Sequence, residues 1–222
     1  MSEASPTVVF DFDLTLTQWD TADRFFRWLL KRQSWRLLIV LALAPVLAPL
    51  LLFQSTRKFP VRYAVWLATL GVSEKHLQQL VQEHADELFR GSAPVFLQEG
   101  LQRLQAHLEQ GHRVVIATGC LEVLAKELLD RAGYAHVPLV GSTLQPYLGG
   151  MARREHCFGP NKIPMLSRRG FAPPWAFTYN DHQCDLPVLK LSTERFLINP
   201  RPEAVRLIRR ELACDTTILT WR

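Results

Sequence analysis

Two aspartates separated by one residue follow a short apolar run near the start of the chain. The run is Val8, Val9 and Phe10, and Asp11 and Asp13 come directly after it. Such a run is typical of a buried strand in a parallel sheet, where ligands bind beyond the carboxyl ends of the strands. One carboxylate could attack as a nucleophile while the other transfers a proton. Because two such close carboxylates repel each other, we expect a bound cation; the alternative is a turn with solvated aspartates.

Further polar residues follow later apolar runs or tight turns. These residues are Thr118, Gly119, Lys162, Asp181 and Asp185. Each alone has an ordinary explanation as part of a strand-to-helix turn, a solvated lysine or a loop carboxylate. In this order after Asp11 and Asp13, the set resembles the motifs of the haloacid dehalogenase (HAD) superfamily of phosphohydrolases, from Val8 to Pro187.

The resemblance implies a role for each residue in phosphate transfer. Asp11 would attack phosphorus and form an aspartyl-phosphate, and Asp13 would protonate the leaving oxygen and then activate water. Thr118 and Gly119 would bind phosphate oxygens, and Lys162 would hold the nucleophile and the transferring group together. Arg153 and Arg154 are alternatives to Lys162, but their spacing fits the motif less well.

The resemblance also implies a magnesium site. Asp181 would bind Mg²⁺ together with Asp11 and the backbone carbonyl of Asp13, and Asp185 would support this ligand set. Magnesium prefers oxygen ligands and keeps waters while it engages phosphate. Asn180 stands where many members carry glycine, and we expect it to tolerate the left-handed conformation.

The composition is that of a folded protein that binds anions. The chain has 222 residues, 48% of them apolar and 21% charged, with a net charge of +5 and a pI of about 9.2. It is not a disordered chain, and its charge permits nucleic acid, anionic lipid or phosphorylated substrates as partners. The four cysteines contain no C-x-x-C pair and are expected to be reduced thiols, and the start of the chain lacks a signal-peptide pattern.

Residues 37–53 form an unusual run of 17 apolar residues that contains Pro45 and Pro49. Basic residues flank the run: Lys31, Arg32 and Arg36 before it, and Arg57, Lys58 and Arg62 after it. If Asp11, before the run, shares a site with Lys162, after it, a single membrane crossing is excluded. A re-entrant hairpin, an in-plane amphipathic pair or a buried helix pair remain. We favour insertion into a membrane, with the flanking basic residues at its anionic headgroups.

The remaining pattern alternates strands and helices, which predicts an α/β fold with a doubly wound, mostly parallel sheet of the HAD-like (Rossmann-like) type. We assign residues 1–18 and 92–222 to a catalytic core and residues 19–91 to a helical cap inserted after the first strand. This early helical insert resembles the phosphoserine phosphatase-like branch, and its basic and apolar segment is similar to the phosphatidylglycerophosphatase C type. Asp20 stands where phosphoserine phosphatases tend to carry a glutamate that binds the substrate amino group, and Leu14 where a small residue is frequent.

The sequence therefore predicts a Mg²⁺-dependent phosphomonoesterase. The expected substrate is phosphatidylglycerophosphate, hydrolysed to phosphatidylglycerol at the cytoplasmic side of the inner membrane. Two alternatives remain open: a cytoplasmic phosphatase of a small metabolite such as phosphoserine, and a membrane-bound interaction protein without turnover. Nucleic acid is not expected as a partner, because the basic residues gather at the apolar segment rather than on a recognisable nucleic-acid module.

Overall fold

The chain forms a seven-stranded sheet with the strand order β4-β3-β2-β1-β5-β6-β7. This computed structural model describes residues 5–51, 58–212 and 216–222. The strands are β1 Thr7–Phe10, β2 Arg113–Leu121, β3 Leu139–Tyr147, β4 Gly150–Glu155, β5 Trp175–Asn180, β6 Ser192–Ile198 and β7 Thr217–Leu219. All neighbouring strands are parallel except β3 and β4. The predicted α/β fold with a mostly parallel sheet is confirmed.

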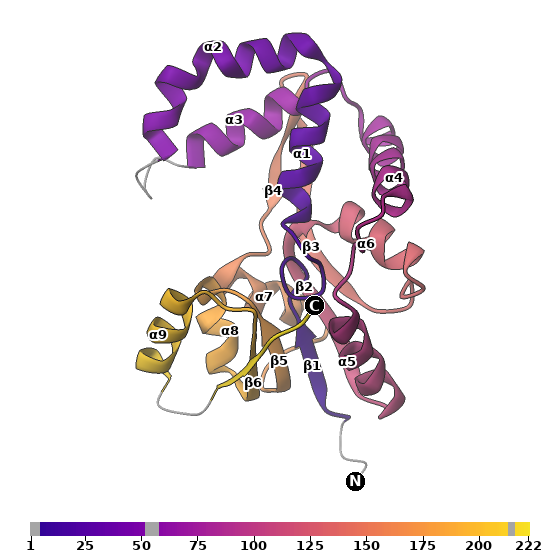
Figure 1. Cartoon of the computed structure of the whole chain (residues 1–222), viewed down its shortest axis with the longest axis vertical. Helices are drawn as coiled ribbons and strands as arrows, with labels where there is room; N and C mark the ends of the chain where they lie inside the picture. The colour runs from indigo at the N-terminus through magenta and orange to yellow at the C-terminus, as the bar shows by residue number, and fades with distance from the viewer. Residues whose placement is uncertain (1–4, 52–57, 213–215) are drawn as a thin grey trace.

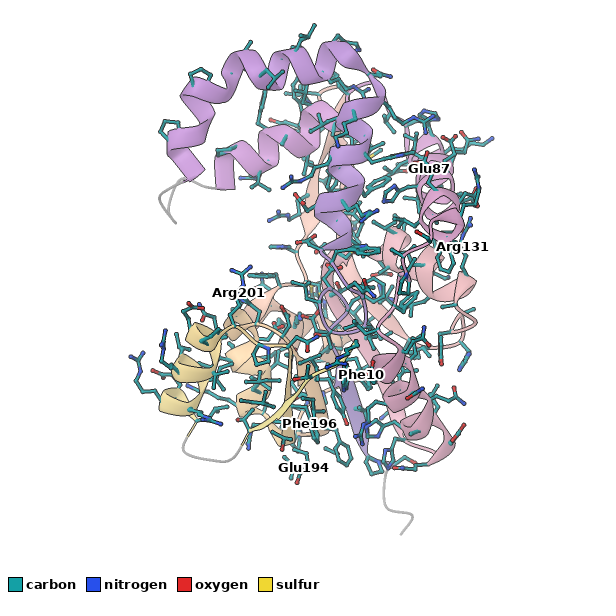
Figure 2. The ribbon with its side chains drawn as sticks, in the orientation of Figure 1. Phe10, Glu87, Arg131, Glu194, Phe196 and Arg201 are labelled. Carbon is teal, nitrogen blue, oxygen red and sulfur yellow. The ribbon has the colours of Figure 1, made fainter. Side chains whose placement is uncertain are left out.

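Strand β1 lies where the direction of winding reverses. The chain proceeds from β1 through β2 to β3 on one side, and then returns to β5, β6 and β7 on the other. Alternate residues of β1 serve opposite faces: Val8 and Phe10 pack into one core cluster, and Val9 packs into a second. Phe10 stacks on Tyr179, which in turn stacks on Phe196 (Figure 2). Ligands bind at such a switch point, so β1 is placed to present a site.

Helices connect the strands and cover both faces of the sheet. Between β1 and β2 lie α1 Thr21–Arg32, α2 Ser34–Leu51, α3 Lys58–Ala68, α4 Glu74–Arg90 and α5 Gln98–Glu109. The later helices are α6 Glu122–Arg131, α7 Lys162–Arg168, α8 Leu186–Lys190 and α9 Pro202–Glu211, with 3-10 turns η1 Gly159–Asn161 and η2 Gln183–Asp185. Residues of α5 and α6 belong to the core cluster of Phe10, whereas Met165 and Leu166 of α7 and Val188 of α8 belong to the cluster of Val9.

Helices α1 to α4 occupy the predicted insert after β1, and α1, α2 and α3 gather beyond one end of the sheet (Figure 1). Asp20 caps α1 by accepting a hydrogen bond from the Asp23 amide at 2.8 Å, and Ser73 caps α4 through the His76 amide at 3.2 Å. Both residue types are favoured at the N-cap position of a helix. Arg131 of α6 (labelled in Figure 2) pairs with Asp86 of α4, and this ion pair holds α4 against α6.

Helix α2 carries most of the predicted apolar segment 37–53, of which residues 52 and 53 lie outside the described residues. Pro45 and Pro49 lie inside the helix, and Figure 1 shows α2 bending, as expected for interior prolines. Leu38 and Leu41 are 65% and 60% exposed. Among the described residues, no helix combines the length and the apolarity that a membrane span requires.

Arg36 was expected to be one of the basic residues that face anionic headgroups beside the apolar segment. This prediction was wrong, because the Arg36 side chain is buried. Its guanidinium donates hydrogen bonds to the carbonyl of Ala68 at 2.8 Å and to that of Leu70. Burial lowers the pKa of this guanidinium. Arg36 therefore satisfies carbonyls at the end of α3, where a cation is favourable, instead of facing an external anion.

Strands β3 and β4 form a long antiparallel hairpin. Its turn consists of Leu148 and Gly149, which both have positive φ angles, 45° and 76°. Strand β4 packs against α3 (Figure 1). A β-carbon at Gly150 would lie 2.7 Å from the Trp66 carbonyl oxygen, so this close approach of hairpin and α3 requires glycine.

Cys120 and Cys157 are buried free thiols, as predicted for these two. Cys214 lies outside the described residues.

One buried histidine makes stability dependent on pH. His84 of α4 is 3% exposed, packs against the rings of Phe25 and Trp28, and has no hydrogen-bond partner for either ring nitrogen among the described residues. Burial lowers its pKa to about 4 from the usual value of 6.5. The neutral form is therefore favoured in the folded state, and its contribution is complete above pH 6.5 and lost as the pH falls towards 4.

We predict that His84→Leu removes part of the acid sensitivity. Relative to the wild type, the variant should gain about 3 kcal/mol in the free energy of unfolding between pH 6.5 and pH 4, measured by urea denaturation. When the free energies of unfolding of the two proteins are subtracted at each pH, the titrations that both proteins share cancel. If the free energy of unfolding changes with pH in the same way in both proteins, His84 is not a source of the acid sensitivity.

Candidate active site

The predicted site residues converge at the carboxyl edge of the three central strands. Asp11 follows the last residue of β1, Thr118 lies in β2, and Asp181 follows the last residue of β5. Strand β1 pairs in parallel with both β2 and β5, and the Asp11 amide continues this pairing by donating to the Tyr179 carbonyl at 2.8 Å. The sheet topology thus gathers residues that are far apart in the sequence.

A buried ion triad lies at the centre of the site. The Nζ atom of Lys162 is 3.0 Å from Asp11 Oδ1 and 2.7 Å from Asp185 Oδ2, and the Lys162 side chain is 2% exposed. Burial alone would lower the pKa of Lys162, but the charges of Asp11 and Asp185 outweigh it and raise this pKa. The lysine is therefore charged, and it is Lys162 rather than an arginine of β4 that reaches Asp11, as the sequence predicted.

The turn before Lys162 fits tightly against the turn that carries Asp185. Gly159 has a φ of 55°, and a β-carbon there would lie 3.1 Å from the Cys184 carbonyl oxygen. Both the conformation and the close contact favour glycine. The Gly-Pro-Asn turn therefore sets the position of the lysine. Arg153, the weighed alternative, instead contacts His156 Nδ1 at 3.1 Å.

Asp11 has one carboxylate oxygen engaged by the protein. Its Oδ1 accepts a hydrogen bond from the Phe12 amide at 2.8 Å and pairs with Lys162. Burial raises the pKa of Asp11, and the positive charge of Lys162 opposes that rise. Because no described donor contacts Oδ2, this oxygen can approach an electrophile or a cation.

Asp13 is bound by the first residue of α1. Its Oδ1 accepts hydrogen bonds from the Thr21 amide at 2.9 Å and from the Thr21 hydroxyl at 2.6 Å. Burial, followed by the nearby charge of Asp20, raises the pKa of Asp13 to about 7. A carboxyl group with such a pKa can give and take a proton near neutral pH. Sequence reasoning considered Thr21 only as a possible helix cap, and no local pattern reveals its contact with Asp13.

Thr118 and Gly119 lie within β2, not after it, because the strand continues to Leu121 beyond the predicted end at Ala117. The Thr118 side chain is fully buried, and its hydroxyl oxygen accepts a hydrogen bond from the Cys120 amide at 2.9 Å. The strand pairing is irregular between Ala117 and Leu121.

Ser142 supports this segment and was not identified from the sequence. Its hydroxyl donates to the Gly119 carbonyl at 2.8 Å and accepts from the Cys157 amide at 3.1 Å. It thereby joins β2 to the segment that leads to Lys162. A β-carbon at Gly119 would lie 3.3 Å from the Phe158 ring, so glycine leaves room for that ring beside the site.

Asp181 and Asp11 form a carboxylate pair on neighbouring strand ends. Burial and the charge of Asp11 raise the pKa of Asp181. Two such carboxylates favour a hard divalent cation, and Mg²⁺ needs only one or two protein carboxylates besides waters and phosphate. No cluster of three or more histidine, cysteine or acidic side chains suited to a metal is found in the described part of the chain. The donor set of two carboxylates therefore fits Mg²⁺.

Asn180 and Leu14, which lie next to the motifs, have backbone conformations that were not expected from the sequence. Asn180 is the last residue of β5 and does not adopt a positive φ, so tolerance of the left-handed conformation is not needed there. Leu14 does adopt it, with a φ of 57°, and is 40% exposed beside Asp13. Asp185 is buried, with Oδ2 on Lys162 and no hydrogen-bond partner for Oδ1 among the described residues.

We predict that Lys162→Met destabilises the fold by about 3–5 kcal/mol at pH 7.5, because it leaves two buried carboxylates without their cation. Urea denaturation in the presence of a chelator measures this free energy. Adding Asp185→Asn to Lys162→Met should restore part of the loss, because one of the two charges is then removed. Wild-type stability of Lys162→Met, or further loss in the double variant, would contradict the ion triad.

Solved structures with the same fold include several hydrolases. The chain resembles a protein of unknown function from Bordetella pertussis Tohama I, with a TM-score of 0.72, 17% identity, and coverage of 97% of this chain and 99% of that one. It resembles cytosolic 5′-nucleotidase IIIB bound to cytidine, with a TM-score of 0.63, 11% identity, and coverage of 96% and 79%. It also resembles a phospho-aspartyl intermediate analogue of phosphoserine phosphatase, with a TM-score of 0.60, 12% identity, and coverage of 97% and 94%.

These likenesses, all under 25% identity, concern the fold. The family comparison goes further, because residues 8–190 match the haloacid dehalogenase-like hydrolases and include every predicted site residue. As the motifs predicted, this chain belongs to the haloacid dehalogenase-like hydrolase family.

Proposed function

We propose that this protein is a Mg²⁺-dependent phosphomonoesterase that works through an aspartyl-phosphate on Asp11. The observation that carries the proposal is the buried contact of Lys162 with Asp11 at the end of β1. The cation holds one carboxylate oxygen in place while the other remains free, and it can also neutralise a transferring phosphoryl group. Family membership makes hydrolysis the expected reaction class.

In the proposed first step, the free oxygen of Asp11 attacks phosphorus and the ester oxygen leaves with the proton of Asp13. The raised pKa of Asp13, about 7, suits this donation. In the second step, the Asp13 carboxylate takes a proton from water, which attacks phosphorus and releases inorganic phosphate and Asp11. Thr118 and Lys162 would hold the phosphoryl oxygens throughout. Bound Mg²⁺, held by Asp11, Asp181 and the Asp13 carbonyl, would neutralise phosphate charge.

The proposed substrate is a lipid phosphate, with phosphatidylglycerophosphate as the first candidate, at the cytoplasmic side of the inner membrane. The exposed apolar side chains of α2 support this choice, since Trp35, Leu38 and Leu41 are 44%, 65% and 60% exposed. Apolar exposure of this kind favours contact with lipid or protein. The burial of Arg36 removes one of the predicted basic contacts, but Lys31 and Arg62 are exposed.

The second candidate is a phosphatase of a small metabolite such as phosphoserine. The structural likeness to phosphoserine phosphatase favours it. In this chain, however, Asp20 stands where an amino-binding glutamate would be expected, and its Oδ1 is already engaged by the Asp23 amide in capping α1. That engagement favours a substrate without an amino group at this position.

We expect Asp11→Asn to abolish phosphate release, because the amide is a much poorer nucleophile, and Asp13→Asn to lower kcat by about 10²- to 10⁴-fold. The assay is inorganic phosphate release with Mg²⁺, and removal of the metal with a chelator should also abolish it until Mg²⁺ is restored. Asp23→Asn, at an exposed position on α1, is the matched control and should keep wild-type activity. Unaltered turnover by Asp11→Asn would overturn the nucleophile assignment.

The substrate class is tested by comparing kcat/KM for three phosphomonoesters. We expect phosphatidylglycerophosphate in mixed micelles to exceed both its deacylated headgroup and phosphoserine, because the acyl chains would contribute binding free energy at the apolar insert. A clear preference for phosphoserine would overturn the lipid proposal. Equal values for the lipid and its deacylated headgroup would limit recognition to the headgroup.

A further inference from the structure

The turn of the β3–β4 hairpin exposes two large apolar side chains. Tyr147 is 54% exposed and Leu148 is 74% exposed. Leu148 also has a φ of 45°, in the left-handed region that asparagine and glycine tolerate better than leucine. Leucine is therefore unfavourable here both for the backbone and for solvation. A residue that costs stability in two ways suggests a role outside the fold.

The turn is firmly joined to helix α3. The indole Nε1 of Trp66 donates to the Leu148 carbonyl at 3.2 Å, and the Gly71 amide donates to the Gly149 carbonyl at 2.6 Å. Further along the hairpin, the Met151 amide donates to the Thr69 hydroxyl at 2.9 Å. These contacts fix the turn on the end of α3.

The same end of α3 is joined to α2, so the exposed apolar residues belong to one assembly. Arg36 of α2 donates to the carbonyls of Ala68 and Leu70, next to the residue that binds the hairpin turn. Trp35 precedes this arginine on α2 and Leu38 follows it, and they are 44% and 65% exposed. The start of α2, the end of α3 and the hairpin turn thus meet through a continuous set of hydrogen bonds.

The charges of this assembly are of one sign. The chain has 21 acidic residues, but none lies in residues 33–73 or in residues 139–154. Arg62 and Arg154 are exposed, and the pKa of Arg153 is lowered by burial and by the positive charge of neighbouring Arg62. The first carboxylate beyond α3, Glu74, is followed by Lys75. Glu74 and Lys75 line the same hollow as Tyr147 and Leu148, so this carboxylate at the turn has a lysine beside it. Apolar side chains among mainly basic ones are complementary to a lipid surface with anionic headgroups.

We propose that the Tyr147–Leu148 turn is a contact point with an anionic membrane, in addition to the apolar helix α2. This inference rests on the proposed membrane location. Leu148 would enter the acyl region, and Tyr147 would lie at the level of the headgroups, where tyrosine is favoured. Strand β3 belongs both to the hairpin and to the central sheet. A membrane contact at the turn would therefore fix the orientation of the candidate active site relative to the lipid.

The test uses Leu148→Asn, with Leu191→Asn as the matched control. Asparagine tolerates a positive φ, so Leu148→Asn should keep or raise the thermal stability while it removes the apolar group. Leu191 is 38% exposed and directly precedes β6. It therefore lies at the amino ends of the parallel strands, whereas the site lies at their carboxyl ends. Binding is measured by co-sedimentation with phosphatidylglycerol vesicles and with phosphatidylcholine vesicles.

We expect the wild type and Leu191→Asn to bind phosphatidylglycerol vesicles equally and to bind phosphatidylcholine more weakly. Leu148→Asn should bind phosphatidylglycerol about tenfold more weakly, with unchanged turnover of a water-soluble aryl phosphate. If the wild type binds vesicles and Leu148→Asn binds as well, the contact proposed for the turn is wrong and the proposed location stands.

Other outcomes separate the remaining explanations. If the wild type binds neither kind of vesicle, the proposed membrane location fails together with this inference. Equal weakening by Leu148→Asn and Leu191→Asn would also overturn the contact proposed for the turn. If the wild type is a dimer in solution and Leu148→Asn is a monomer, the turn contacts a second copy of the chain, and the lipid assignment is overturned.

Discussion

A lysine ammonium buried between two carboxylates is the constraint on which the rest of this structure depends. Removing three charges from water is costly, and the cost is offset only when the geometry lets the charges neutralise and hydrogen-bond one another. Lys162 meets this condition through Asp11 at 3.0 Å and Asp185 at 2.7 Å. Asp11 follows β1, Asp185 lies in η2, and Lys162 follows η1, so the strand order and the tight glycine at position 159 both serve this ion triad.

The site and the helical insert are coupled through one residue. Thr21 begins α1 and donates both its amide and its hydroxyl to Asp13. Helix α1 buries Phe25 and Leu29 in the same core cluster as β1, and the β3–β4 hairpin, which grows from the sheet, holds α3. The insert is thus attached to the sheet both at the catalytic loop and at the hairpin. A ligand that orders either attachment can therefore affect the position of the other.

Much of the sheet and the central site could be predicted because they depend on patterns that are local in sequence. Apolar runs mark the strands, and the residue after each run marks its end, which is enough to place Asp11 and Asp181 at the ends of strands. That the two residues share a site was implied by the resemblance to the HAD superfamily. The missed features are contacts between residues 8 to 32 positions apart that no periodic pattern connects: Thr21 with Asp13, Ser142 with Gly119, and Arg36 with the carbonyl of Ala68. Residue type alone placed Arg36 in solvent, because arginine is rarely buried without a paired carboxylate.

The most direct test of the account is a crystal structure of the protein with Mg²⁺ and beryllium trifluoride, which mimics a phosphoryl group on a carboxylate. The account predicts the mimic on the Oδ2 atom of Asp11, within hydrogen-bond distance of Lys162 Nζ and the Thr118 hydroxyl, with the metal between Asp11 and Asp181. A mimic bound at another residue, or a Lys162 side chain directed away from Asp11, would contradict it.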